Sequence, residues 1–196
     1  AYWFEGLNEG KWITSSYYMD KLPKWVKEFN TSSNMSKYLK TWNTLYDINL
    51  YHESGPDNSN YEKGFIGKTS PVFPYNLKEL MASNEGYDII KTSPFGNTMI
   101  TDFAFSAIEA ESLGDDEFTD FLTISYSSTD YVGHDFGLSS VELQDTYLRL
   151  DLEIERLLNY LDKNIGIGNY TLFLTADHGA AEVPAYLSDI NVPGSN

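Results

Sequence analysis

Two short apolar runs constrain the fold of this chain more than any other feature. Residues 120–126 (DFLTISY) and 170–176 (YTLFLTA) each have the length of one strand, and the second run is largely apolar on both faces. A run of that kind is typical of a central strand in a parallel sheet that helices cover. We therefore expect both runs to be strands of one buried sheet.

Helical patterns alternate with these runs. Residues 99–113 carry apolar side chains at helical spacing and end before Gly114, where a helix commonly stops. A longer helix is expected from about residue 141 to Lys163, preceded by Ser139 and Glu142 in the S-x-x-E pattern of a capping box. The order is α-β-α-β, which predicts an α/β fold with parallel strands joined by a right-handed crossover.

The first half of the chain has shorter and less regular patterns. We expect a strand at residues 11–18 and short helices at residues 19–30, 35–45 and 77–82, while residues 61–95 are rich in Gly and Pro. This contrast predicts two parts. Residues 1–95 are interpreted as a cap or insertion segment packed on the core, and residues 96–196 as the α/β core segment with the candidate ligands.

Charge and composition exclude several classes of function. The formal net charge is -16, from 29 acidic and 13 basic residues, which argues against a nucleic-acid partner. A phosphate ester would need a local positive centre, such as a pair of divalent cations. The chain has no Cys, so disulfides, thiolate zinc sites and a Cys nucleophile are excluded. No apolar run approaches the roughly 18 residues of a membrane span, and the start at Ala1 without a signal peptide is expected to be a fragment boundary or a processed terminus.

A carboxylate and an imidazole follow each of the two predicted strands. Asp130 and His134 come after the first run, and Asp177 and His178 directly after the second. In open α/β sheets the ligand crevice lies beyond the carboxyl ends of the strands, and these oxygen and nitrogen donors suit Zn²⁺. Gly133 is expected to allow a tight loop between Asp130 and His134. Asp177 and His178 are adjacent, so on an extended backbone they would point to opposite sides and each could face one of two metals.

Each pair alone also has a simpler explanation as a turn or a surface pair. The neighbouring Ser127, Ser128 and Thr129 are interpreted as hydroxyls that satisfy backbone groups at a strand end, because no adjacent base is identifiable. Asp135 and Asp151 are expected on the surface. The candidate metal ligands are therefore Asp130, His134, Asp177 and His178, with no catalytic residue in this chain.

These motifs resemble the alkaline phosphatase superfamily. The similarity lies in residues 127–137 (SSTDYVGHDFG) and 174–181 (LTADHGAA), and the flanking sequence is most similar to the PafA-like monoesterases, which are related to nucleotide pyrophosphatases and phosphodiesterases. The further matching segments are residues 14–19 (TSSYYM), 22–26 (LPKWV), 92–97 (TSPFGN) and 147–151 (YLRLD).

The resemblance implies a site with two Zn²⁺ ions per complete enzyme. It assigns Asp130 and His134 to one zinc, and Asp177 and His178 to the other. The Thr nucleophile, the phosphate-gripping Lys and Arg and the remaining zinc ligands of the family have no counterpart here, so the chain resembles an internal segment that should be nearly inactive alone. Leu138 departs from the proline that the family shows after Phe-Gly.

Three functions stay open at this point. The first is a segment of a zinc-dependent phosphomonoesterase acting on small phosphate esters, the second a phosphodiesterase or nucleotide pyrophosphatase of the same superfamily, and the third a non-catalytic module stabilised by metal. The resemblance also implies a periplasmic or secreted protein, and the lack of a long apolar run argues against a membrane partner. The oligomeric state does not follow from the sequence.

Overall fold

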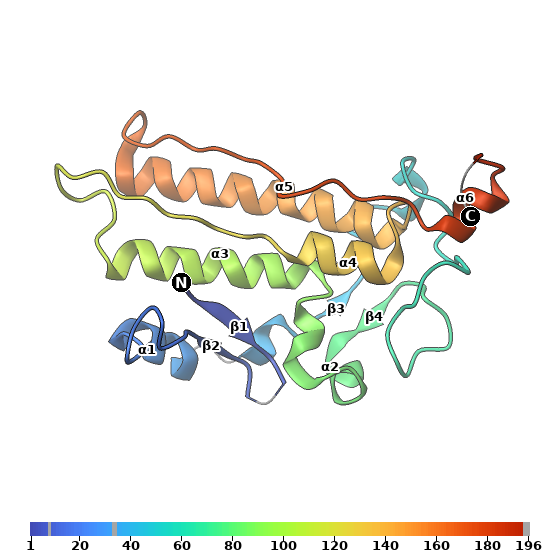
Figure 1. The fold of residues 1–196 in the computed structure, drawn as a ribbon, viewed down its shortest axis with the longest axis horizontal. Helices are drawn as coiled ribbons and strands as arrows, with labels where there is room; N and C mark the ends of the chain where they lie inside the picture. Colours follow the sequence, from blue (N-terminus) through green and yellow to red (C-terminus); the bar gives the residue numbers. More distant parts are fainter. Residues whose placement is uncertain (8, 33–34, 194–196) are drawn as a thin grey trace.

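A layer of long helices organises this protein. The structure, a computed structural model, describes residues 1–7, 9–32 and 35–193. Helices α3 and α5 lie side by side, α4 continues the layer beyond the end of α3, and two small antiparallel strand pairs with short helices lie on one side of it (Figure 1). The elements are β1 (Trp3–Glu5), β2 (Lys11–Ile13), α1 (Lys24–Ser32), η1 (Met35–Tyr38), β3 (Thr41–Trp42), η2 (Ile48–Leu50), β4 (Tyr75–Asn76), α2 (Leu77–Leu80), η3 (Met81–Ser83), η4 (Gly86–Ile90), α3 (Pro94–Ala110), α4 (Ser128–Phe136), α5 (Val141–Leu161), η5 (Asp162–Gly166) and α6 (Pro184–Asp189).

Side-chain contacts fix α3 against α5. The rings of Phe105 and Tyr160 stack with centroids 4.0 Å apart. Close by, Arg156 of α5 donates to Asp102 of α3 over 2.8 Å and to Glu153 of its own helix. Packing of this kind stabilises an amphipathic helix more than its intrinsic propensity does. The long helices were predicted from the helical spacing of their apolar side chains. Helix α3 begins five residues earlier than expected, because Pro94 fits a first helical turn.

One buried cluster joins both halves of the sequence. The ring of Trp12 in β2 stacks on Phe103 of α3 with centroids 3.8 Å apart. Trp42 of β3 and Tyr75 of β4, which pair across the two strands, are fully buried and pack against Phe136 of α4. The two strand pairs therefore complete the core beneath the helices. The division near residue 95 remains a prediction, and the hydrophobic core crosses it.

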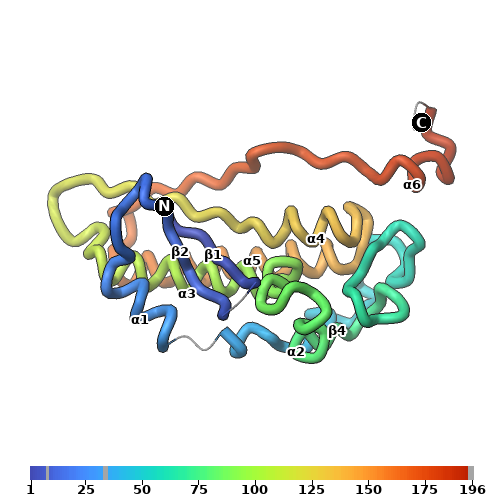
Figure 2. Tube along the Cα trace, turned by 60° about the horizontal axis from the view of Figure 1, so that its bottom comes forward, coloured from blue at the N-terminus to red at the C-terminus, as the bar shows by residue number. Residues whose placement is uncertain are grey.

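Neither predicted core strand forms a strand in the described part of the chain. Residues 120–126 and 170–176 have no ladder partner, and the two described sheets are the antiparallel pairs β1–β2 and β3–β4. Both runs are nevertheless extended, and Figures 1 and 2 both show them running in the same direction along the helix layer. A strand requires neighbours that accept its hydrogen bonds. The two helices of the predicted α-β-α-β order are therefore present, while its parallel strands are not confirmed.

Several shorter predictions were wrong in extent. The strand expected at residues 11–18 stops at Ile13, and the helix expected at 35–45 is a single turn, η1, followed by β3. The helix expected at residues 19–30 begins only at Lys24. Pro23 has no backbone N–H, so a helix that started at residue 19 would lack a hydrogen bond at this position. The helix expected at 77–82 is divided between α2 and η3.

The N-terminal cap of α5 was assigned to the wrong serine. Ser140, not Ser139, is the capping residue, and its Oγ accepts from the backbone N–H of Leu143 over 3.1 Å. Ser139 donates to Glu182 instead. Glu142 does not complete a capping box, because its side chain is buried against Tyr75. Within the described residues, no helix combines the length and the apolar character that crossing a membrane requires.

Candidate metal centre

Helix α4 positions the first pair of candidate ligands. Asp130 and His134 lie four residues apart and therefore on one helix face, with the His134 Nε2 atom 3.5 Å from Asp130 Oδ1. The expected tight loop was wrong, because residues 128–136 are helical. Gly133 is an ordinary helical residue, and a Cβ there would meet nothing closer than 3.8 Å. The left-handed glycine is Gly137, which ends the helix at a φ of 88°.

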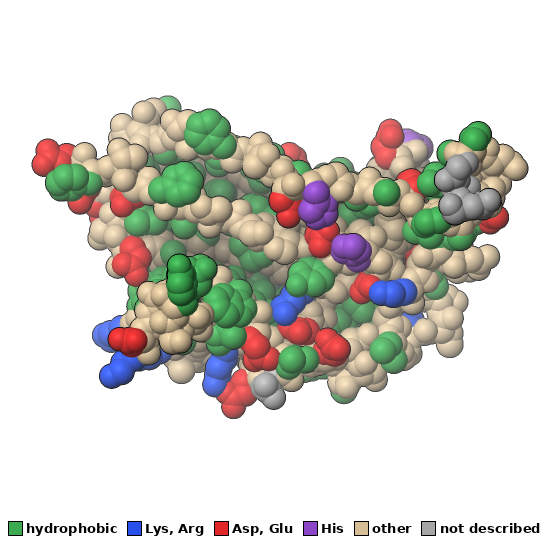
Figure 3. Space-filling view, in the orientation of Figure 1, with side chains coloured by type: hydrophobic (Ala, Val, Ile, Leu, Met, Phe, Trp, Pro, Cys, Tyr) green, Lys and Arg blue, Asp and Glu red, His purple; other side chains and the backbone are tan. Residues whose placement is uncertain are grey.

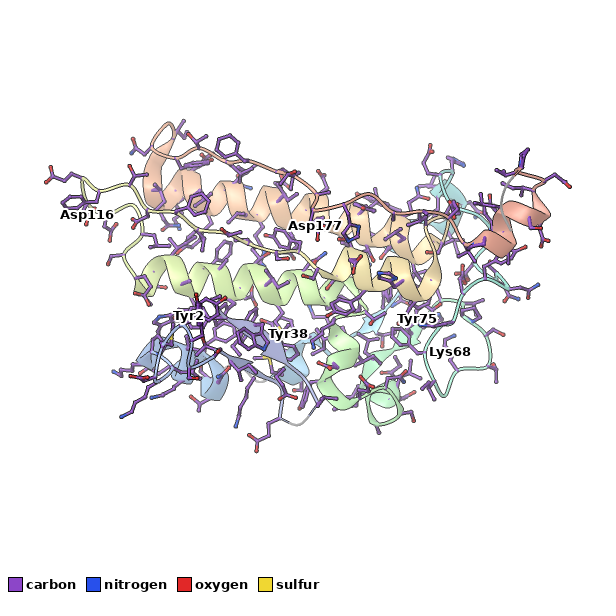
Figure 4. All side chains as sticks on the ribbon, viewed as in Figure 1. Tyr2, Tyr38, Lys68, Tyr75, Asp116 and Asp177 are labelled. Carbon is purple, nitrogen blue, oxygen red and sulfur yellow. The ribbon has the colours of Figure 1, made fainter. Side chains whose placement is uncertain are left out.

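The extended segment after Leu174 brings the second pair to the same place. His178 Nε2 lies 3.8 Å from Asp130 Oδ1 and 3.8 Å from Asp177 Oδ2. Figure 4 shows Asp177 on this segment where it passes α4, and Figure 3 shows two histidine side chains beside acidic ones on this face. The structure thus brings together four side chains from two segments far apart in the sequence.

The imidazole of His178 is held in a defined orientation. Its Nδ1 atom lies 2.9 Å from the carbonyl oxygen of Gly179, so this nitrogen donates and Nε2 faces the carboxylates. The hydrogen bond to Gly179, followed by the charges of Asp177 and Asp130, raises the pKa of His178. Outward-facing Nε2 with Nδ1–H bound to a carbonyl is the arrangement that metal-ligating histidines commonly show.

The group is open to solvent and incomplete as a coordination shell. The Asp130 side chain is 47% exposed and that of Asp177 is 91% exposed. Among residues 1–7, 9–32 and 35–193, no group of three or more His, Cys, Asp and Glu side chains is arranged to hold a metal ion. Two carboxylates and two imidazoles fit Zn²⁺ by their chemistry. A closed shell would need further ligands or a contraction of the present ones.

The hydroxyl run beside Asp130 has local partners. Thr129 Oγ1 donates to the carbonyl oxygen of Tyr126, and Ser125 and Ser127 hydrogen bond to each other. Thr129 therefore satisfies a backbone group, as the sequence predicted. Asp135, expected on the surface, is partly buried and pairs with Lys63 over 3.0 Å.

Sequence reasoning missed two buried carboxylates in the first turns of α5. Glu142 and Asp145 of α5 are both fully buried. Asp145 accepts from Trp42 Nε1 over 2.7 Å and from the Tyr51 hydroxyl over 2.5 Å, and it pairs with Arg149. The sequence does carry a signal for this burial, because both acids lie among apolar residues of α5 such as Val141.

Comparisons with known proteins place the chain in a family. The model of the type I phosphodiesterase / nucleotide pyrophosphatase family matches residues 2–193. A protein named calcium-transporting ATPase from Myroides odoratus is 53% identical over 96% of this chain, alkaline phosphatase PhoV from Synechococcus elongatus 49% over 99%, and alkaline phosphatase PafA from Elizabethkingia meningoseptica 46% over 98%.

The chain spans 35% of the length of each of these three relatives. Among solved structures, wild-type alkaline phosphatase PafA superposes with a TM-score of 0.91 at 45% identity, over 98% of this chain and 37% of that one. The fold described above is therefore that of a segment of an alkaline phosphatase. The chain belongs to the type I phosphodiesterase / nucleotide pyrophosphatase family within the alkaline phosphatase superfamily.

Proposed function

We propose that this chain contributes one part of a two-zinc site in a phosphomonoesterase. The observation that carries the proposal is the position of Asp130, whose Oδ1 atom lies within 4 Å of the imidazoles of both His134 and His178. Relatives named alkaline phosphatases support a phosphoric ester hydrolase as the activity of the whole protein. Asp130, His134, Asp177 and His178 would hold the metal.

Zinc at this place would supply the positive charge that phosphoryl transfer needs. The chain has a net charge of -16, so a small phosphate ester requires such a centre in order to approach. The residues of this chain contribute orientation: α4 holds Asp130 and His134 on one face, and Gly179 fixes the His178 ring. A Thr nucleophile and the phosphate-gripping groups are proposed to come from outside this chain, so the segment alone should be nearly inactive.

Zinc titration of the complete protein tests the metal site. Replacing Asp130 with Ala removes the carboxylate that faces both imidazoles. Loss of a group that hydrogen bonds a metal ligand lowers metal affinity roughly 10–100-fold. We expect Asp130→Ala to lower zinc affinity by at least that factor. His52→Ala and Asp151→Ala, both exposed, are the matched controls and should leave the affinity unchanged. Calorimetry that showed equal zinc affinity for Asp130→Ala and the parent protein would contradict the proposal and favour a structural module.

A phosphodiesterase or nucleotide pyrophosphatase is the second candidate, because the matching family model carries that description. The chemistry of the metal centre would be the same, and the choice depends on groups that contact the second ester substituent. Turnover of a phosphate monoester and of the matched diester by the complete protein distinguishes the two. We expect the monoester to be the faster substrate, and a faster diester would assign the diesterase function.

A further inference from the structure

The loop of residues 55–63 is attached at both ends to the segment that carries α4. At one end the backbone N–H of Gly55 donates to the Ser139 carbonyl over 2.7 Å. At the other end the N–H of Lys63 donates to the Asp135 carbonyl over 2.8 Å, and Lys63 Nζ pairs with the Asp135 carboxylate. Between these ends, the loop, the α4–α5 turn and the α6 segment line an open pocket of about 310 Å³, and Tyr61 of the loop contacts Tyr186 of α6. Residues 55–63 belong to neither α4 nor α5, so the loop can move without unfolding either helix.

Two carboxyl groups with buried oxygens face each other between this loop and α5. Glu142 of α5 is fully buried, and its Oε1 atom accepts from the Tyr75 hydroxyl over 2.5 Å. The Oε2 atoms of Glu142 and of Glu62 in the loop are both buried, and neither has a hydrogen-bond partner in the described part of the chain. A buried oxygen without a donor is costly when charged, and much less so when it carries a proton.

The charges around these two groups do not neutralise them. Asp57, in the loop, adds a third carboxylate that faces both Glu62 and Glu142. Lys68 faces Asp57 and lies 5.0 Å from the centre of the Tyr75 ring, while Asp145 of α5, which also faces Glu142, is engaged by Arg149. Within the ranges that the structure describes, neither Glu62 nor Glu142 forms an ion pair.

We propose that a proton held by the Glu62–Glu142 pair latches the 55–63 loop onto α5, and that loss of this proton to water in alkaline solution releases the loop. With the proton present, one carboxyl group is neutral and gains an O–H donor. Without it, two negative charges remain buried beside Asp57, and the loop carrying Glu62 and Asp57 is the part free to move into solvent. Release would loosen the contacts at Ser139 and at Asp135, which directly follows the candidate ligand His134.

The direction of the pH dependence follows from the same surroundings. Burial, and then neighbouring carboxylates, raise the pKa of Glu142 and of Glu62 to about 8, from the ordinary value of 4.5. The folded state therefore holds more protons than the unfolded state between about pH 4.5 and 8, so stability falls as pH rises through that window and levels off above it. Because the two groups interact, the titration belongs to the pair.

Hydrogen exchange of the complete protein measures the latch directly. After correction for intrinsic exchange, protection of the Gly55 and Lys63 amides should fall about tenfold for each pH unit between pH 6 and about 8 and level off by pH 9, because the open state holds about one proton fewer than the latched state over that window. Glu142→Gln and Glu62→Gln keep the shape and remain neutral. Both should keep these amides protected at pH 9.

Glu155→Gln, an exposed change on the same helix, is the control and should retain the fall. The proposal is overturned if protection in the parent protein does not change between pH 6 and 9. An equal loss in the Glu62→Gln variant overturns it as well, and that variant, in the loop, stays informative if Glu142→Gln does not fold. The readout is amide protection without metal or substrate, so it is independent of the proposed phosphatase function.

Discussion

Asp145 connects α5 to β3 and the segment after it through a buried hydrogen-bond network. Its carboxylate is fully buried and accepts from the Trp42 indole, the Tyr51 hydroxyl and the backbone of Leu45, while Arg149 supplies the counter-charge. Removing one partner of a buried ionic network leaves the others unpaired, at a cost of about 3–5 kcal/mol. We expect Asp145→Ala to lower the free energy of unfolding by that amount in urea denaturation.

The matched control for this prediction is Asp151→Ala. Asp151 lies on the same helix and is exposed, so its removal should change the free energy of unfolding by no more than about 0.5 kcal/mol. Similar effects of the two substitutions would show that the Asp145 network contributes little. Both substitutions remove one negative charge from α5, so the difference between them measures the effect of burial and hydrogen bonding.

At the scale of the element, the start of α5 distinguishes two adjacent serines. Ser140 caps the helix through the Leu143 N–H, whereas Ser139 donates to Glu182 on the partly exposed side. Loss of a capping hydroxyl costs about 1 kcal/mol. Ser140→Ala should therefore lower the thermal midpoint clearly, and Ser139→Ala should lower it much less. The reverse order would restore the capping box that the sequence pattern predicted.

The elements also show what sequence could and could not predict. Helices α3 and α5 were predicted because their apolar faces repeat over many turns, and a helix satisfies its own backbone. The two apolar runs could not be confirmed as strands, because a strand depends on hydrogen bonds from partners, and the described residues provide none for these runs. Helix α4 was missed because nine residues containing Gly133 give little periodicity.

The closeness of the four candidate ligands was predicted better than the elements that carry them, and their role as metal ligands stays a prediction. Asp130, His134, Asp177 and His178 were identified from their spacing after the two runs, and the structure places them together although α4 is a helix and not a loop. Residue type and chain direction were sufficient for that. The buried pair Glu62 and Glu142 could not be found in the same way, because their meeting depends on a loop whose path no periodic pattern specifies.

At the scale of the whole molecule, the two extended runs leave an apolar surface without cover. Phe121 is 91% exposed, Phe173 86% and Leu174 71%, although these are the side chains expected inside a sheet. Since the chain spans 35% of its relatives, we expect the rest of a full-length protein to bury them. Phe173→Ala should then cost about 3–5 kcal/mol in the full-length protein and less than about 0.5 kcal/mol in the 196-residue chain.

Chemical denaturation of the two lengths measures this difference. Tyr17→Ala is the matched control, because Tyr17 is also 86% exposed but lies in the turn after β2, away from the extended runs. Its effect should be small in both lengths. Equal effects of Phe173→Ala in the long and short proteins would mean that this apolar surface stays exposed in the complete molecule, and that it serves contact with another molecule instead of a shared sheet.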